Sequence, residues 1–270
     1  MPERSTLVMG IVNVTPDSFS DGGRYLGHDA ALAHARRLIA DGADILDIGG
    51  ESTRPGAQPV DQAEEIARTV PLIAAIRAER AIPISIDTMK PAVARAAVSA
   101  GATIWNDVAA LRFSPDAPAV AAELGCEVVL MHMLGMPRTM QDAPRYGDVV
   151  AEVEGFLLAR AAVAQAAGVS HEKIWLDPGI GFGKTLDHNL ALLAALPRLC
   201  GHGFRVLLGA SRKRFIAALD PLAMDADDRL GGSLAAALHG ARSGVAAVRV
   251  HEVRETVQAL AVQAAIGAVR

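Results

Sequence analysis

The sequence predicts an α/β fold of the (β/α)₈ TIM-barrel class, formed as a single domain by residues 1–270. Eight short apolar segments alternate with Ala-rich segments of helical pattern. Most loops that follow the apolar segments are long and polar, whereas those that precede them are short. Strands that alternate with helices form a parallel sheet, which stays open or closes into a barrel. The number of strands favours the barrel, whose active site lies at the carboxyl ends of the strands.

The predicted strands are apolar on both faces, as expected of strands that face helices on one side and a barrel core on the other. They span Leu7–Val12, Ile45–Ile48, Ile84–Ile86, Thr103–Trp105, Val128–Met131, Ile174–Leu176, Val206–Leu208 and Ala247–Val250. Hydrophobic residues make up 51% of the chain and aromatic residues only 4%, so small aliphatic side chains must build this core.

The predicted helices carry good helix formers at helical spacing. They span Asp29–Ala40, Asp61–Glu79, Pro91–Ser99, Asp148–Ala167 and Glu252–Ile266. Asp29 and Asp61 are predicted to be N-caps, because a side-chain oxygen there accepts a hydrogen bond from the first turn. Gly42, Gly101 and Gly168 lie just past the last turns, where glycine ends a helix.

The composition excludes several classes of protein. The formal net charge is −4 and no basic block occurs, which argues against a nucleic-acid surface. The apolar run at residues 7–12 is too short for a signal sequence or a membrane span. Cys126 and Cys200 fit neither a disulfide framework nor a structural zinc site. We therefore expect a cytoplasmic protein without a nucleic-acid or membrane partner.

Two polar loops follow the first two predicted strands, Asn13–Gly23 and Asp47–Gly56. Their residue types are also those of ordinary turns. Both loops are expected on the same rim of the barrel, however, and together they carry groups suited to phosphate and metal. Arg54 offers a planar donor fork for phosphate, and Asn13 and Asp21 offer hard oxygens for Mg²⁺.

The third, fourth and sixth predicted strands lead into Asp87, Asn106 and Asp177. Two carboxylates and an amide at the mouth of a dry barrel are costly to desolvate without partners. A flat heterocycle with amino and ring N–H groups would supply them, because a carboxylate accepts two parallel hydrogen bonds. Asp107 is expected to cap a helix rather than contact a ligand.

The glycine-rich segment Gly179–Thr185 does not have the spacing of a nucleotide-binding loop. A Walker A motif that ends at Lys184 needs glycine where Pro178 stands, and a dinucleotide fingerprint from Gly179 needs glycine at position 184. We expect these glycines to let the backbone pass close beneath a ligand.

The last two predicted strands lead into basic residues. Ser211 is predicted to be an N-cap at a helix start that attracts an anion such as a carboxylate, and Lys213 follows it. Alternation puts Arg249 and His251 on one face of the eighth strand, where they point at one site if that face lies inside the barrel. His132 is expected at the edge of the site and not as a metal ligand.

These segments resemble, in the same order, the motifs of the dihydropteroate synthase family. Met9–Gly23 closely resembles its opening signature and Asp47–Gly56 its second loop. The later strand ends resemble its remaining motifs: Ile84–Thr88, Trp105–Asp107, Asp177–Lys184, Gly209–Phe215 and Arg249–His251. Leu134 and Met136 stand where more polar residues are expected, and Glu252 replaces an expected Asp. The departures affect contacts at the substrate's edge and not the reaction.

The resemblance implies a transferase of folate biosynthesis that works with Mg²⁺, forms a homodimer and is a sulfonamide target. The enzyme would condense 6-hydroxymethyl-7,8-dihydropterin diphosphate with 4-aminobenzoate and release diphosphate. The implied pterin contacts are Asp87, Asn106, Met131, Asp177 and Lys213. The implied diphosphate contacts are Asn13, Arg249 and His251, with Asn13 also at the metal. The implied aminobenzoate contacts are Phe19, Thr53, Arg54, Pro55, Phe182 and Ser211. The implied catalytic set is Asn13, Asp21, Arg54, Lys213, Arg249 and His251.

The chemistry agrees with this set of residues. Diphosphate leaves readily once Mg²⁺, Arg and His take up its charge, and the electron-rich pterin stabilises the resulting cation. No enzymic nucleophile is needed, so positioning supplies most of the rate. Phe19 and Asp21 are expected in a lid that orders with Arg54 around the substrate. The alternatives are a non-catalytic pterin-binding paralogue and a pterin-binding methyltransferase domain.

Overall fold

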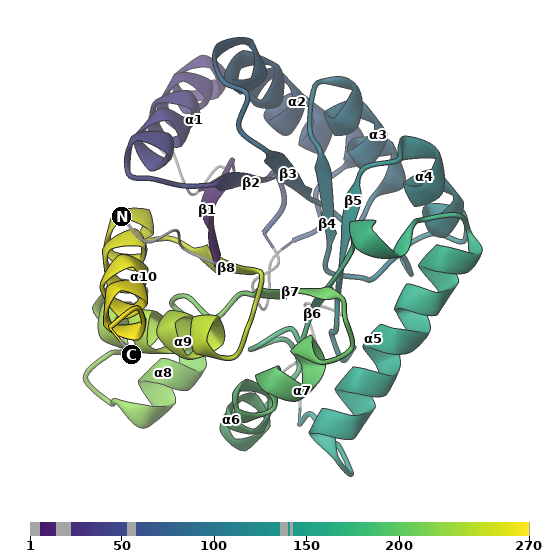
Figure 1. Cartoon of the computed structure of the whole chain (residues 1–270). Coiled ribbons are helices and arrows are strands. Elements are labelled where there is room, and N and C mark those ends of the chain that lie inside the picture. The colour runs from purple at the N-terminus through teal and green to yellow at the C-terminus, as the bar shows by residue number, and fades with distance from the viewer. Residues whose placement is uncertain (1–5, 15–22, 53–57, 136–139, 141–142, 270) are drawn as a thin grey trace.

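The computed structural model describes residues 6–14, 23–52, 58–135, 140 and 143–269. Eight parallel strands form a closed barrel in the order of the sequence, with β8 paired to β1. Figure 1 shows the strands as a central ring and the helices around it. The strands are β1 Leu7–Asn13, β2 Ile45–Gly49, β3 Ile84–Asp87, β4 Ile104–Asp107, β5 Glu127–Met131, β6 Ile174–Asp177, β7 Arg205–Leu208 and β8 Ala247–Val250. The predicted (β/α)₈ barrel and its eight strands are confirmed.

The helices also follow the predicted pattern. They are α1 Gly23–Ala40, α2 Gln62–Glu79, α3 Pro91–Ser99, α4 Ala117–Leu124, α5 Val149–Ala166, α6 Leu186–Ala194, α7 Leu196–Cys200, α8 Arg214–Leu219, α9 Leu230–Arg242 and α10 Val253–Gly267, with short 3₁₀ helices η2 His171–Lys173 and η3 Ala226–Arg229. Asp61 is the predicted N-cap of α2 and accepts a hydrogen bond from the Ala63 N–H. The prediction for Asp29 was wrong, because α1 begins at Gly23 and Asp29 lies within it.

Three predicted helix ends are confirmed by the backbone. Gly42, Gly101 and Gly168 follow α1, α3 and α5 and have φ angles of 98°, 115° and 112°. These angles lie in the region that only glycine adopts at little cost, which explains why each helix stops there.

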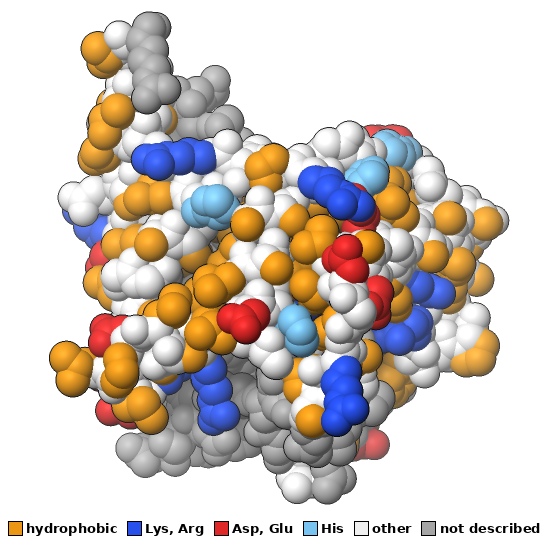
Figure 2. All heavy atoms as spheres, turned by 90° about the horizontal axis from the view of Figure 1, so that it is seen from below, with side chains coloured by type: hydrophobic (Ala, Val, Ile, Leu, Met, Phe, Trp, Pro, Cys, Tyr) orange, Lys and Arg blue, Asp and Glu red, His pale blue; other side chains and the backbone are white. Residues whose placement is uncertain are grey.

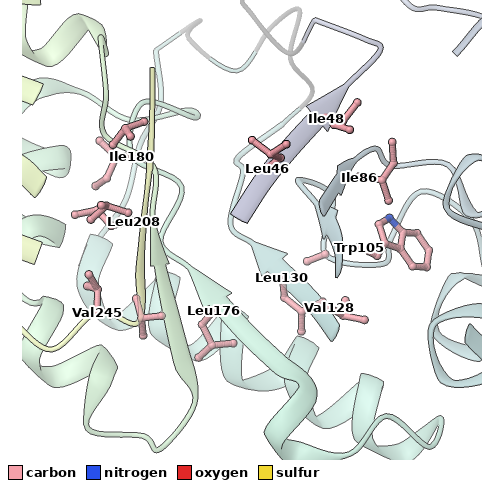
Figure 3. Close-up of a cluster of buried hydrophobic side chains, with 14 of the residues drawn as sticks. Leu46, Ile48, Ile86, Trp105, Val128, Leu130, Leu176, Ile180, Leu208 and Val245 are labelled. Atoms are coloured by element: carbon pink, nitrogen blue, oxygen red, sulfur yellow. The ribbon is translucent and has the colours of Figure 1, made fainter. Parts of the chain in front are cut away.

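The two faces of each strand have different neighbours, because side chains alternate along a strand. The outward side chains form the main core with the helices, and Figure 3 shows members of this core from β2 to β7. The inward side chains form a second apolar cluster inside the barrel: Met9, Ile45, Ile104, Val129, Trp175, Leu207 and Ala247. This inner cluster fills the barrel, so the barrel has a packed centre rather than a pore.

Polar residues stand two positions after members of the inner cluster. Asp47 follows Ile45, Asn106 follows Ile104, Asp177 follows Trp175 and Arg249 follows Ala247. A separation of two residues keeps the side chain on the same face of the strand. The strand period therefore places these polar groups above the inner cluster, at the carboxyl end of the barrel.

We expect Gly179→Ala to destabilise the fold where Gly155→Ala does not. Gly179 has a φ of 66°, and a Cβ there would lie 2.0 Å from the His132 carbonyl oxygen. The substitution should lower the free energy of unfolding by about 2–4 kcal/mol. Gly155, in the middle of α5, has nothing within 4 Å of a Cβ. Alanine there should raise stability by about 0.5–1 kcal/mol. Urea unfolding measures both, and changes of the same sign would contradict the expectation.

Candidate active site

The centre of the polar rim is an ion network across the barrel mouth. The Arg249 guanidinium of β8 donates from Nε to Asp47 Oδ2 of β2 at 2.6 Å and from Nη2 to Asp87 Oδ2 of β3 at 2.7 Å. The Asp47 side chain is fully buried, and that of Arg249 is 20% exposed. Buried carboxylates of this kind are tolerated only when a partner charge and hydrogen bonds compensate for lost water. Arg249 is that partner for both.

Burial changes the acidity of two carboxyl groups in the rim. Burial raises the pKa of Asp87 above its usual range, although the nearby Arg249 charge opposes this shift. Burial also raises the pKa of Asp177 to about 6, while a hydrogen bond of 2.7 Å from the Gly179 N–H opposes the shift. Both groups are therefore poised to change protonation within reach of neutral pH.

An amide group and a small apolar cluster also belong to this end of the barrel. The Asn106 Nδ2 lies 3.4 Å from both carboxylate oxygens of Asp47. Met131 and Phe182 belong to a small buried cluster that also holds Val108, Met133 and Met140. A site with apolar walls and hydrogen-bonding groups at its edge suits a flat heterocycle, whose faces are apolar and whose edge is polar.

Lys213 and Ser211 follow β7 on the same side of the barrel. The Lys213 ammonium lies 4.1 Å from the centroid of the Phe182 ring, in cation–π geometry. The prediction that Ser211 is an N-cap was wrong, because the N-cap of α8 is Lys213. The Ser211 Oγ instead lies 3.0 Å from His251 Nδ1 and donates to Glu252 Oε2 at 3.3 Å. Tertiary contacts with the end of β8 thus hold this hydroxyl.

Arg249 and His251, predicted to point at one site, have different partners. Arg249 binds the two carboxylates of the rim, whereas His251 lies against Ser211 at its edge. The Glu252 that replaces an expected Asp forms an ion pair with Arg212. His251 and Ser211 thus form a second polar group beside the ion network.

The end of β1 offers an oxygen atom for a hard cation. A Cβ on Gly49 would lie 3.8 Å from Asn13 Oδ1 and 3.8 Å from Asp87 Oδ2, but Asp87 Oδ2 already accepts from Arg249, which leaves the Asn13 oxygen as the candidate ligand. Amide and carboxylate oxygens are the ligands that Mg²⁺ takes from proteins, usually one or two of them with substrate phosphates. Across the described ranges, no group of three or more His, Cys, Asp or Glu side chains could hold a metal. These residues fit a magnesium ion held mainly through a substrate.

Several predicted site residues lie outside the described residues: Phe19, Asp21, Thr53, Arg54 and Pro55; so does Met136, one of the departures from the family pattern. The structure brings the others to one end of the barrel. Asp107 points away from this group and accepts hydrogen bonds of 2.7 Å from the N–H groups of Ala109 and Leu111. It caps the turn after β4 rather than a helix, so the expectation was right about the capping role and wrong about the element.

Two residues of the site were missed from the sequence. Asp47 was counted in the second polar loop without a role of its own, whereas it lies within β2, two residues after Ile45, and faces inward. Lys184 is buried and its Nζ contacts His132, whereas the sequence offers only a lysine in a glycine-rich loop. His132 itself is buried away from solvent, which lowers its pKa to about 3 and keeps it neutral.

The chain matches known proteins along nearly its whole length. The family model described as pterin binding enzyme matches residues 9–251. The dihydropteroate synthase of Escherichia coli K12 is 48% identical over 255 residues, which cover 94% of this chain and 89% of that protein.

Solved structures agree with the sequence match. Xanthomonas albilineans dihydropteroate synthase with 4-aminobenzoic acid is 52% identical, with a TM-score of 0.92 over 98% of this chain and 94% of that one. The same organism's enzyme in complex with 7,8-dihydropteroate is 48% identical, with a TM-score of 0.89 over 100% and 96% of the two chains. The chain therefore belongs to the pterin-binding enzyme family, and within it to the dihydropteroate synthases.

Proposed function

We propose that this chain condenses 6-hydroxymethyl-7,8-dihydropterin diphosphate with 4-aminobenzoate to 7,8-dihydropteroate and releases diphosphate, as a transferase of folate biosynthesis. The whole chain acts as one pterin-binding domain. The observation that carries the proposal is the rim of Asp87, Asn106 and Asp177 around Arg249, on top of a packed apolar barrel. Relatives solved with 4-aminobenzoic acid and with 7,8-dihydropteroate support both substrate classes.

The pterin binds in the rim with its polar edge toward the carboxylates. Asp177 and Asp87 accept its amino and ring N–H groups, and Asn106 supplies donors and acceptors beside them. Met131 forms an apolar wall, and Lys213 bonds to the ring system from the side of Phe182. When the pterin binds, its N–H groups donate hydrogen bonds to the ionised carboxylates of Asp87 and Asp177. These hydrogen bonds offset part of the free-energy cost of burying the two charges.

The diphosphate lies toward Asn13, Arg249 and His251. Arg249 donates to phosphate oxygens as it does to Asp47 and Asp87, since its fork matches either kind of anion. Asn13 contributes an oxygen to Mg²⁺, which when bound takes up negative charge on the leaving group. The protein holds the diphosphate in the orientation from which it leaves. It also fixes the positive charge of Arg249 beside the diphosphate before the bond breaks.

The 4-aminobenzoate enters between the wall of Phe182 and the hydroxyl of Ser211, with Phe19, Thr53, Arg54 and Pro55 completing its pocket. Its amine is neutral at pH 7 and attacks without a strong base, so orientation matters more than proton transfer. Asp21 and Arg54 take part in excluding water from the pterin cation as the first two loops close.

The enzyme acts in the cytoplasm as a homodimer. Within the described residues, no helix is both long and apolar enough to cross a membrane. Figure 2 shows the side that lies lowermost in Figure 1, near α6, α7 and α8, where apolar side chains gather among charged ones. Leu219, Leu222 and Met224, at and after the end of α8, are 58%, 88% and 70% exposed. This α8 patch supports contact with a second copy.

The purified protein should form dihydropteroate and diphosphate from both substrates with Mg²⁺, as chromatography of the product would detect. Asp177→Asn should weaken pterin binding by about 10–100-fold, because the amide replaces one acceptor with a donor. Asp220→Asn is the matched control, since Asp220 is exposed and its side chain accepts from the Leu222 N–H. Absence of product from the wild type across conditions would refute the proposed reaction.

Pterin affinity should fall as the pH drops through about 6. The raised pKa of Asp177 means that protonation competes with the ligand below that pH. The proton taken up by Asp177 should raise the dissociation constant about tenfold per pH unit, on top of the contribution from Asp87, whose pKa is also raised. Calorimetry with a pterin that does not titrate in this range measures the effect. Asp177→Asn should flatten this part of the profile, and an unchanged slope would exclude Asp177 as its source.

Sedimentation should give about twice the chain mass of 28.1 kDa. Leu222→Glu should shift the protein toward the monomer, because a charge in an apolar interface is costly. Val269→Glu is the control, since Val269 is equally exposed, 88%, but lies outside the α8 patch. A wild-type monomer, or equal effects of the two variants, would contradict the proposed interface.

A further inference from the structure

A buried ammonium group joins the two loops that follow β5 and β6. Here the β5 loop means residues 132–135 and the β6 loop residues 178–185. Lys184 is only 4% exposed, and its Nζ donates to His132 Nδ1 at 3.0 Å, to the His132 carbonyl at 3.2 Å and to the Phe182 carbonyl at 3.0 Å. An ammonium group has three N–H donors, so these contacts use all of them. Lys184 therefore bonds to the protein and has no donor left for a ligand.

Other contacts hold these two loops in place. The Asp177 carbonyl accepts from the His132 N–H at 3.0 Å, and the Gly183 carbonyl accepts from Tyr146 Oη at 2.8 Å. A Cβ on Gly183 would lie 2.7 Å from the Leu134 carbonyl oxygen. The two backbones are thus in direct contact, and glycine permits it.

The burial of this lysine is costly, which points to more than packing. Burial lowers the pKa of Lys184 to about 7, so the charged form is disfavoured relative to a solvated lysine. His132 stays neutral and keeps a lone pair for the ammonium, because burial lowers its own pKa to about 3. An apolar side chain of similar volume would often stabilise a fold equally well. An apolar side chain could not, however, hold the His132 ring, the His132 carbonyl and the Phe182 carbonyl in one fixed arrangement, as the three donors of Lys184 do.

The β6 loop carries two groups that face the proposed pterin site. The Phe182 carbonyl is one of the three acceptors of the Lys184 ammonium. The centroid of the Phe182 ring lies 4.1 Å from the Lys213 ammonium. The Gly179 N–H donates to Asp177 Oδ1 at 2.7 Å and so orients that carboxylate. Movement of the β6 loop would displace both.

We propose that Lys184 is a positioning residue for the pterin: it ties the β6 loop to the β5 loop and thereby presets Phe182, Lys213 and the Asp177 carboxylate. The proposal rests on the proposed function, in which these groups hold the pterin. Lys184 itself touches neither substrate.

The test compares two lysine-to-methionine substitutions, each of which removes one ammonium group, with the conservative variant Lys184→Arg. Lys184→Met keeps the length of the side chain and leaves three acceptors unpaired. It should raise the pterin dissociation constant about 10–100-fold, since small displacements of binding groups cost that much. The KM for 4-aminobenzoate should rise by a smaller factor, because Phe182 is one wall of that pocket whereas Lys213 and Asp177 both contact the pterin. Lys184→Arg, which restores charge and donors, should recover part of the pterin affinity. Lys173→Met is the control, because Lys173 Nζ bonds the Gly125 carbonyl at 2.6 Å near the opposite end of β6.

A loss of pterin affinity in Lys184→Met that exceeds the loss for 4-aminobenzoate, with Lys173→Met unchanged, supports the proposal. Unchanged pterin affinity, or equal losses for both substrates, overturns it and leaves Lys184 a purely structural residue. If Lys184→Met does not fold, Lys184→Gln decides, because its shorter side chain keeps two N–H donors but cannot reach all three acceptors. A smaller but selective pterin loss then supports the proposal, and no loss overturns it. Pterin binding by wild type without product would refute the proposed reaction alone, since calorimetry tests Lys184 independently of turnover.

Discussion

The charge balance at the barrel mouth is the constraint on which the site depends. Asp47 and Asp87 come from neighbouring strands, and both would be too costly to bury without the Arg249 guanidinium between them. Arg249 comes from the last strand, so this network forms only when β8 has closed on β1. Closure of the barrel and assembly of the site are therefore the same event. The apolar cluster beneath excludes water, which lowers the local dielectric constant and strengthens the attraction within each ion pair.

The fold could be predicted because its pattern repeats. Each strand is a short apolar run between a short loop and a polar one. Because this pattern occurs eight times, the fold class follows from it even where the bounds of one strand or helix are wrong. The polar strand ends could also be predicted, since parallel strands bring their carboxyl ends to one edge. Asp87, Asn106, Asp177 and Arg249 accordingly lie at one end of the barrel.

What failed was local or three-dimensional in origin. Asp29 has the residue type of an N-cap, yet α1 extends to Gly23 because nothing between them stops a helix. Ser211 also looks like a cap, but contacts with His251 and Glu252 hold it two residues before the real cap. The role of Lys184 depends on a loop about fifty residues earlier in the chain, at His132, and no local pattern shows that contact. Pairings across the chain leave no signal in a single sequence.

The alternation of each strand also limits how this chain can change in length. Trp175 and Asp177 share the inward face of β6, while Leu176 between them packs outward in the main core. Deleting one residue inside this strand would exchange the two faces, turning a carboxylate toward the helices and an aliphatic group toward the substrate. Insertions and deletions are therefore compatible with the catalytic rim only in the connecting loops. During divergence the strands can accept substitutions, but their residue count is fixed by the chemistry at their ends.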